Sequence, residues 1–157
     1  MTDISLLVSE LRSTTVKRRR AAATLLGKSG NLTAIKPLID ALADPHPGVR
    51  SDSVQALGRL RDSSAIGGLI ISLKDMDPHV RAAAIDAIGK IKDRDAVEPL
   101  VHCLFDTEVT VRIGAAEVLG KLGDRRAIGP LKECEHDPFS EVRQAAETAV
   151  RKIQAKT

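Results

Sequence analysis

The sequence predicts an all-α fold, a right-handed α-solenoid in which about ten helices form stacked pairs. First, the 157 residues repeat with a period of 31 residues. Second, apolar residues within each copy recur at helical spacing, as at Val80, Ala84, Ala87, Ile88 and Ile91. Third, the chain has no Trp or Tyr and only two Phe. A core of small aliphatic side chains lets helices approach closely, which favours thin stacked layers over one globular centre.

Four series of identical residues keep the 31-residue register along the chain. They are Arg19, Arg50, Arg81, Arg112 and Arg143; Gly27, Gly58, Gly89 and Gly120; Ala34, Ala65, Ala96 and Ala127; and Leu7, Leu38, Leu69, Leu100 and Leu131. Each copy is predicted to hold two antiparallel helices, A and then B, joined by short turns. Helix A follows turns such as Asp77-Pro78, where Asp can cap the helix and Pro suits its first position.

The chain is predicted to be one repeat domain spanning residues 1–157. The expected order is a lone helix B at 3–12, four A–B pairs at about 14–43, 46–74, 77–105 and 108–136, and a lone helix A at 140–155. Arg18 stands where the other copies have Val, and Glu147 and Arg151 replace an apolar residue and the repeated Gly. Glu147 and Arg151 are spaced for an i,i+4 ion pair. Polar outer faces stop a solenoid from stacking, so we expect a complete array.

The pattern Asp-x-x-Val-Arg-x-x-Ala-x-x-x-Leu/Ile-Gly-x-Leu/Ile-x-Asp-x-x-Ala-Ile/Val-x-Pro-Leu resembles the short HEAT-like repeat of the phycobilisome-lyase type. The resemblance covers nearly the whole chain and implies the HEAT-like fold. It also implies a role in, or accessory to, the bilin lyase–isomerase group. Metal-dependent hydroxylases built from HEAT-like repeats carry paired His-Glu dipeptides, whereas this sequence has none and only the reversed Glu135-His136.

The arginine series is predicted to form an internal ladder in which each Arg pairs with the turn Asp of the preceding copy. The expected pairs are Asp62 with Arg81, Asp93 with Arg112, and Asp124 with Arg143. A basic stripe for phosphates is the alternative, but the constant 19-residue offset and the planar guanidinium favour carboxylate pairing. The glycine series costs about 1 kcal/mol per helix relative to Ala. We expect the neighbouring helix to pack against this bare backbone.

Charge and cysteine content limit the partners. A net charge of +3 with 29% charged residues of both signs does not indicate a surface specialised for nucleic acid or membranes. The cluster Lys17-Arg18-Arg19-Arg20 with Lys28 is predicted to be a solvated cap, and a nucleic-acid backbone site is the alternative. Cys103 and Cys134 occupy equivalent places in adjacent copies, too far apart for a disulfide, and should be free thiols.

No catalytic set is visible in the sequence. His46, His79, His102 and His136 do not recur at one position, and no Ser-His-Asp or Cys-His spacing implies proximity. We therefore expect no enzyme activity, no metal and no cofactor. A short, non-basic N-terminal apolar run, the lack of a membrane-length segment and two cysteines predict a cytoplasmic protein. The sequence does not fix the oligomeric state.

The positions of helix B that vary between copies are predicted to bind a protein partner on a concave side, which makes the protein a non-catalytic scaffold. Gly67 and Gly129 should leave a shallow hollow, and Ile71 and Phe105 should be exposed apolar contacts. The predicted partner-binding residues are Lys36, Asp40, Gly67, Ile71, Arg94, Glu98, His102, Phe105, Arg125, Gly129 and Glu133.

Overall fold

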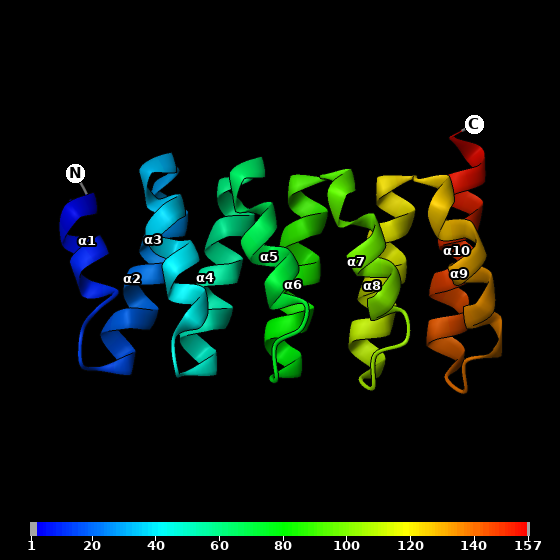
Figure 1. Cartoon of the computed structure of the whole chain (residues 1–157), viewed down its shortest axis with the longest axis horizontal. Helices are drawn as coiled ribbons and strands as arrows, with labels where there is room; N and C mark the ends of the chain where they lie inside the picture. The colour runs from blue at the N-terminus through cyan, green and yellow to red at the C-terminus, as the bar shows by residue number, and fades with distance from the viewer. Residues whose placement is uncertain (1–2, 157) are drawn as a thin grey trace. The chain divides into compact units, whose positions relative to one another are not determined.

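The computed structural model describes residues 3–156, and within that range the protein is entirely helical (Figure 1). The long A helices are α2 (Val16–Ser29), α4 (Pro47–Leu60), α6 (Pro78–Ile91), α8 (Val109–Leu122) and α10 (Ser140–Ala155). The short B helices are α1 (Ile4–Glu10), α3 (Ile35–Asp40), α5 (Ile66–Ser72), α7 (Val97–Cys103) and α9 (Ile128–Glu133). The predicted all-α fold of about ten helices is thereby confirmed.

Short 3-10 helices flank most of the B helices. Those that precede a B helix are η1 (Leu32–Ala34), η3 (Ser63–Ala65), η4 (Arg94–Ala96) and η5 (Arg125–Ala127). Those that follow one are η2 (Ala41–Ala43) and η6 (Cys134–His136). An Asn or Asp begins each preceding turn, and its side chain accepts the backbone N–H two residues later. Asp62, for example, accepts from Ser64 at 2.9 Å. These turns lead the chain from one helix into the next.

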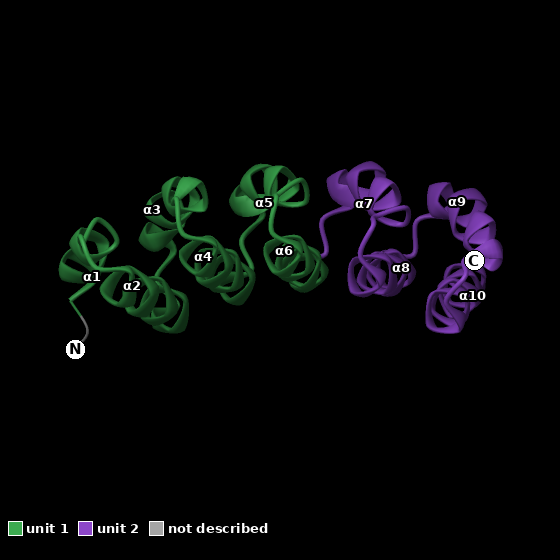
Figure 2. Cartoon of the chain, turned by 90° about the horizontal axis from the view of Figure 1, so that it is seen from below, with its two compact units in different colours: residues 1–91 green, residues 92–157 purple. Residues whose placement is uncertain are grey.

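The chain divides into two compact units, Met1–Ile91 and Lys92–Thr157 (Figure 2). Unit 1 contains α1 to α6, and unit 2 contains α7 to α10. Within each unit the A helices lie in one layer and the B helices in another (Figure 2). The prediction of one domain over residues 1–157 stays a prediction.

The A helices begin at turns that contain residues favoured at helix N-termini. Asp77 accepts the backbone N–H of His79 at 2.8 Å, and α6 starts at Pro78, as predicted. Pro47 likewise takes the first position of α4. Proline suits this position because the first N–H groups of a helix have no partner within the helix. Gly30, at the end of α2, has a φ of 68°, which glycine adopts without steric cost.

Glycine sets the spacing of the A helices. A Cβ on Gly27 would lie 2.6 Å from Ala56 Cα in the next A helix. The corresponding distances are 2.8 Å from Gly58 to Ala87 and 2.9 Å from Gly120 to Ala149. The next helix therefore packs against bare backbone, and the prediction for the glycine series is confirmed at these three positions.

The Gly–Ala contacts between successive A helices also determine which side of unit 1 is the more closely packed. The pairs α2–α4 and α4–α6 pack tightly, whereas successive B helices make at most weak contact with each other. In Figure 2 the row α1, α3, α5 lies on the outer side of the curve of unit 1. The prediction that the B helices line a concave side therefore does not hold for unit 1. Its physical reason is that the helices held close by Gly and Ala form the inner row.

Removing the buried hydroxyl of Ser53 should stabilise the protein. Ser53 in α4 is fully buried, and its Oγ has no hydrogen-bond partner among the described residues. Ser53→Ala should raise the free energy of unfolding by about 1 kcal/mol, because an unpaired polar group is removed and Ala favours helix. Chemical denaturation measures the change. The matched control is Ser72→Ala, because the buried Ser72 hydroxyl donates to Gly68 O at 3.1 Å and its loss should not stabilise. An equal gain in both variants would contradict the argument.

Candidate functional site

All of the predicted partner-binding residues are exposed. In unit 1 they lie on α3 (Lys36 and Asp40) and α5 (Gly67 and Ile71). In unit 2 they lie on η4, on α7, just after α7, on η5 and on α9, and they are Arg94, Glu98, His102, Phe105, Arg125, Gly129 and Glu133. Exposure makes these side chains accessible to a partner. That they bind one stays a prediction.

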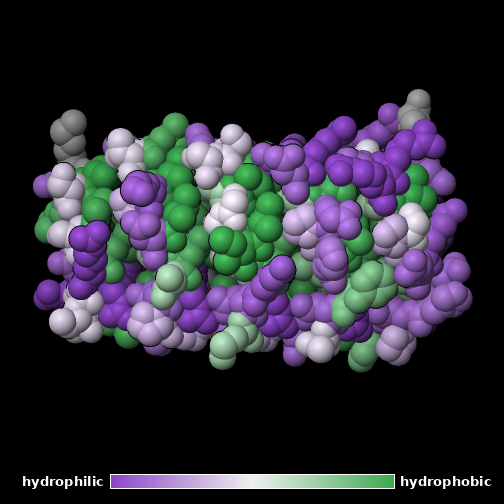
Figure 3. Space-filling model, in the orientation of Figure 1, coloured by the Kyte–Doolittle hydropathy of each residue, from purple (hydrophilic) through white to green (hydrophobic). Residues whose placement is uncertain are grey.

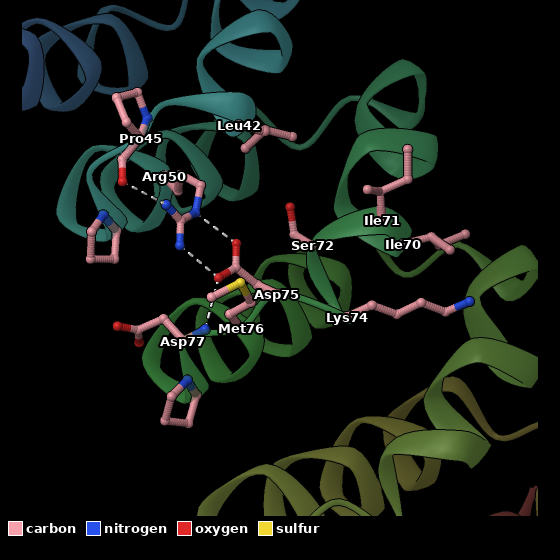
Figure 4. A pocket seen from close by; sticks show the side chains of 12 residues that line it. Leu42, Pro45, Arg50, Ile70, Ile71, Ser72, Lys74, Asp75, Met76 and Asp77 are labelled. Carbon is pink, nitrogen blue, oxygen red and sulfur yellow. Dashed lines mark hydrogen bonds and ion pairs between the residues drawn. The ribbon is translucent and has the colours of Figure 1, made fainter.

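An apolar cleft of about 850 Å³ opens beside α5 in unit 1 (Figure 4). Ile71 and Met76 dominate its rim, since Ile71 is 75% exposed and Met76 is 94% exposed. Its other lining residues are Leu42, Pro45, Pro47, Arg50, Ile70, Ser72, Lys74, Asp75, Asp77 and Pro78. The space-filling view also shows apolar patches over α3 and α5 (Figure 3). Large apolar side chains that are mostly exposed beside a hollow are typical of a contact surface.

The sequence of α5 explains the shape of this cleft. Gly68 takes the place that proline has in three other B helices. A Cβ on Gly68 would meet Leu42 Cδ1 at 2.9 Å, so the glycine lets Leu42 lie against α5. Gly67 has open space around its Cβ position. The absence of side chains at both glycines leaves Ile70 and Ile71 as the apolar groups that α5 contributes.

Sequence reasoning identified Ile71 but missed Met76. Ile71 stands where other copies have Asp40, His102 and Glu133, so an apolar residue there has no repeated structural role. Met76 lies in the turn between α5 and α6, at a place taken elsewhere by Pro or Thr. The same signal, one apolar residue among unlike equivalents, would have identified Met76 had the turns been compared as the helices were.

The arginine ladder exists, but its carboxylate partners differ from those predicted. In three of the five copies the guanidinium reaches forward to the Asp 25 residues later, in the turn before the next A helix, and not back by 19 residues. The three pairs are Arg19 with Asp44 at 2.7 Å, Arg50 with Asp75 at 2.7 Å, and Arg112 with Asp137 at 2.8 Å. The reading of the series as an internal ladder therefore holds for these three arginines, and the predicted pairs were wrong.

The predicted carboxylates have another use, which is the physical reason for the correction. Asp62, Asp93 and Asp124 accept N–H groups of their own 3-10 turns, at the entry to the B helices. Hydrogen bonds from the Arg126 side chain and backbone lower the pKa of Asp124 to about 2. These aspartates are therefore occupied locally and do not take part in the pairs predicted with Arg81, Arg112 and Arg143.

One rung of the ladder forms a polar wall of the cleft (Figure 4). Arg50 donates to both carboxylate oxygens of Asp75, at 2.7 and 2.8 Å, and to the carbonyls of Asp44 and Pro45. Burial acts to raise the pKa of Asp75, but the hydrogen bonds from Arg50 and the Asp77 N–H outweigh it and hold that pKa below its ordinary value. The wall is thus a fixed ion pair that offers no free charge to a ligand.

The basic cluster is partly neutralised within the protein. Arg19 pairs with Asp44 in the ladder, and Arg20 pairs with Asp52 of α4 at 2.7 Å. Lys17 and Arg18 are exposed. Two of the four consecutive cations are therefore held by carboxylates, which weakens the case for a phosphate-binding patch.

Cys103 and Cys134 are buried and form no disulfide with each other, as predicted. Each thiol lies 3.5 Å from the carbonyl oxygen four residues before it, where it acts as a small packing group. Over residues 3–156, no three His, Cys, Asp or Glu side chains gather in a way that would hold a metal ion. In the same range no helix has the length and apolar character needed to cross a bilayer.

Known proteins share this architecture. The family model for HEAT repeats matches residues 4–70 and 66–151. A solved structure of the complex of CpcE and CpcF of phycocyanin lyase from Nostoc sp. PCC7120 is similar, with 27% identity and a TM-score of 0.85. The match covers 99% of this chain and 66% of that chain, so this chain spans just under two thirds of its relative's length. A comparison with curated proteins finds no match.

More distant structures share the fold alone. A designed armadillo repeat protein in complex with the peptide (KR)4 is 21% identical, with a TM-score of 0.71 over 96% of this chain and 81% of that chain. Human deoxyhypusine hydroxylase in complex with glycerol is 16% identical, with a TM-score of 0.54 over 97% of this chain and 84% of that chain. Together with the 31-residue repeat, the glycine spacing and the arginine ladder, these matches lead to one conclusion: the chain belongs to the HEAT-repeat family, and its repeats are similar to those of the phycocyanin lyase proteins.

Proposed function

We propose that this protein is a non-catalytic scaffold that binds a protein partner on its exposed B helices, with the cleft beside α5 as the main contact. The observation that carries the proposal is the exposure of Ile71, at 75%, in a position that is polar in the other copies. Met76 lies on the same rim and is 94% exposed. Two buried cysteines that are not joined in a disulfide support a cytoplasmic location.

The two side chains at the rim fit the physics of a binding hot spot. Burying an exposed Ile or Met side chain contributes about 1.5–3 kcal/mol each before association costs are subtracted. A methionine adapts its shape to a partner because its side chain is unbranched and polarisable. The fixed Arg50–Asp75 wall adds a polar boundary without an unpaired charge to desolvate. An apolar segment of a partner protein, such as one face of an amphipathic helix, matches this surface.

Unit 2 presents a more polar B-helix surface. Its exposed predicted residues carry both signs of charge, with Arg94 and Arg125 against Glu98 and Glu133. His102 lies between them in sequence, and its Nδ1 is 2.9 Å from Glu98 O. Charged groups of this kind contribute to partner choice and association rate more than to affinity. We infer that this surface selects among partners while the cleft of unit 1 supplies binding energy.

Replacing Ile71 with Glu tests the proposal. The partner is first identified by capture with the unchanged protein, and its affinity is then measured with purified components. Ile71→Glu and Met76→Glu should each weaken binding at least about tenfold, because a charge would be buried against an apolar partner. Leu6→Glu is the control, since Leu6 is 58% exposed on α1 and does not line the cleft. Unchanged affinity in the two cleft variants, with helicity intact by circular dichroism, would remove the proposed site.

A second candidate is a subunit or accessory protein of bilin attachment. It is favoured by the 27% identity to the phycocyanin lyase structure over 99% of this chain. The test is co-expression with a bilin source and a phycocyanin subunit as acceptor. Covalent chromophore on the acceptor that depends on this protein would support the second candidate. Equal chromophore attachment with and without the protein would count against it.

A further inference from the structure

The cleft beside α5 presents a protruding apolar side chain and an apolar hollow on the same surface. Met76 is 94% exposed and Ile71 is 75% exposed at the rim of an opening of about 850 Å³. The other apolar groups that line this opening are Leu42, Pro45, Pro47, Ile70 and Pro78. A surface that holds both a knob and a hole of the same character can pack against a copy of itself.

The turn that carries Met76 is held in place by hydrogen bonds. Arg50 donates to both carboxylate oxygens of Asp75, at 2.7 and 2.8 Å, and the same carboxylate accepts the backbone N–H of Asp77 at 2.9 Å. From α6, Arg81 donates to the carbonyl oxygen of Asp75 at 2.9 Å. The backbone at Met76 is therefore ordered before any contact forms, and binding has to order only the side chain.

The polar side chains inside the cleft already have partners. Arg50 and Asp75 form an ion pair, and the Ser72 hydroxyl donates to Gly68 O at 3.1 Å. Apolar side chains can therefore cover these groups without leaving an unpaired charge or an unpaired donor. The surface that covers the centre of the cleft needs to be apolar and does not need to supply a charge there.

The rim of the cleft carries two charges of opposite sign. Within the part of the chain that the structure describes, neither Lys74 nor Asp77 forms an ion pair, although Asp77 accepts the N–H of His79 at 2.8 Å and feels the charge of Arg50. Figure 4 shows the side chains of Lys74 and Asp77 pointing to opposite sides, with Met76 between them. A second copy that docks across a two-fold axis between these charges places Lys74 of each copy opposite Asp77 of the other. The surface is thus complementary to itself in charge as well as in shape.

We propose that the cleft beside α5 pairs with the same cleft of a second copy of this chain. Met76 of each copy enters the hollow of the other beside Ile71, and Lys74 faces Asp77 at both ends of the contact. A surface of this size makes a weak dimer, so a partner with a larger apolar segment can displace the second copy. The inference rests on the proposed function in that both use this cleft, and it assigns self-association as the way in which the free protein covers its binding surface.

Sedimentation equilibrium of the purified protein tests the dimer. Between about 10 μM and 1 mM, a range in which small interfaces assemble, the mean mass should rise from 16.8 kDa towards twice this value. Ile71→Glu and Met76→Glu should each stay monomeric throughout, because a carboxylate would be buried in an apolar hollow. Leu6→Glu is the control and should keep the rise, since Leu6 is 58% exposed on α1 and does not line the cleft. Circular dichroism checks that each variant is folded.

Two further measurements test the two-fold arrangement. Lys74→Glu should weaken self-association at least about tenfold, because the new carboxylate would face Asp77 of the other copy at both ends of the contact. Adding Asp77→Asn should restore part of the loss, since Asn removes the repulsion and still caps α6. In a mixture of chains labelled either at Met methyl groups or at Ile methyl groups, we expect an intermolecular nuclear Overhauser effect between Met76 and Ile71.

Three results would overturn the proposal. The first is a mean mass of 16.8 kDa at every concentration, and the second is a rise in mass that persists in Ile71→Glu and Met76→Glu. The third is a dimer without the Met76–Ile71 effect, because the copies would then meet through another surface. A monomeric protein whose partner still binds at the cleft would remove this inference alone. A dimer formed at the cleft, with a partner affinity that Ile71→Glu leaves unchanged, would remove the proposed function alone.

Discussion

Replacing Arg112 with methionine is expected to lower the free energy of unfolding by about 2–3 kcal/mol. Arg112 and Asp137 are both about 10% exposed, and their ion pair is supported by bonds from Arg112 to Asp106 O and Thr107 O. The methionine keeps much of the volume but leaves Asp137 a partly buried carboxylate without its partner. The cation also lies 5.6 Å from the centre of the Phe139 ring, and this contact is lost as well. Urea denaturation measures the change.

The control for this variant is Arg126→Met. Arg126 also pairs with an aspartate, Asp124 at 2.9 Å, but its side chain is 61% exposed and the pair lies within one turn. Water screens such a pair, so its removal should leave the denaturation midpoint nearly unchanged. A double variant with Asp137→Asn should recover part of the loss, because no unpaired charge then remains. If Arg112→Met and Arg126→Met destabilise equally, the ladder contributes no more than surface ion pairs do.

The second large effect is expected at the contact between A helices. Gly58→Ala should destabilise unit 1 by about 1–3 kcal/mol, although Ala is the better helix former, because its Cβ would lie 2.8 Å from Ala87 Cα. A backbone atom cannot rotate away, so α4 and α6 must separate. The measurement is thermal or chemical denaturation followed by circular dichroism.

Gly67→Ala provides a matched comparison on α5. Nothing lies within 4 Å of the Cβ position of Gly67, so this change should stabilise the protein by about 0.5–1 kcal/mol. The same chemical substitution is thus expected to have opposite signs at the two glycines. A stabilising Gly58→Ala would show that the A helices do not depend on bare backbone for their approach.

The fold was predictable because the repeat carries the same information several times. Val49, Val80 and Val111 are buried at one helical position, and Arg18 is the exposed exception at the chain's first copy. Each copy thus tests the assignment made for the others. The first residues of the helices were also predictable, as at Asp77 and Pro78, because a helix cap depends only on residues close in sequence.

The ladder partners could not be chosen from spacing alone. In a repeat of fixed period, every aspartate series lies at a constant offset from the arginines, so offsets of 19 and 25 residues are equally regular. Whether an arginine meets the aspartate 19 residues before it or the one 25 residues after it depends on the direction in which its side chain points. The pair of Arg50 with Asp75 shows that the side chain points forward. Asp62 also has a hydrogen-bond donor close in sequence, because its carboxylate accepts the backbone N–H of Ser64. Periodicity identifies which residues are equivalent but not which of them meet.

The curvature of unit 1 was within reach of the sequence but was assigned to the wrong side. A glycine that lets the next A helix approach also makes the A side the more closely spaced side. The B helices must then lie on the outer side, where Ile71 and Met76 are accessible. The exposed residues were predicted correctly because exposure depends on the position within one repeat, whereas curvature depends on contacts between repeats.

The central claim is that a partner binds at the cleft beside α5, and hydrogen exchange measured with and without the captured partner tests it most directly. Residues 66–78 contain α5, Ile71, the turn with Met76 and the first position of α6. Binding at the cleft predicts slowed backbone exchange across this segment, and no slowing there when Ile71→Glu is used at the same partner concentration. Slowed exchange confined to other segments, with residues 66–78 unchanged in a saturated complex, would contradict the account.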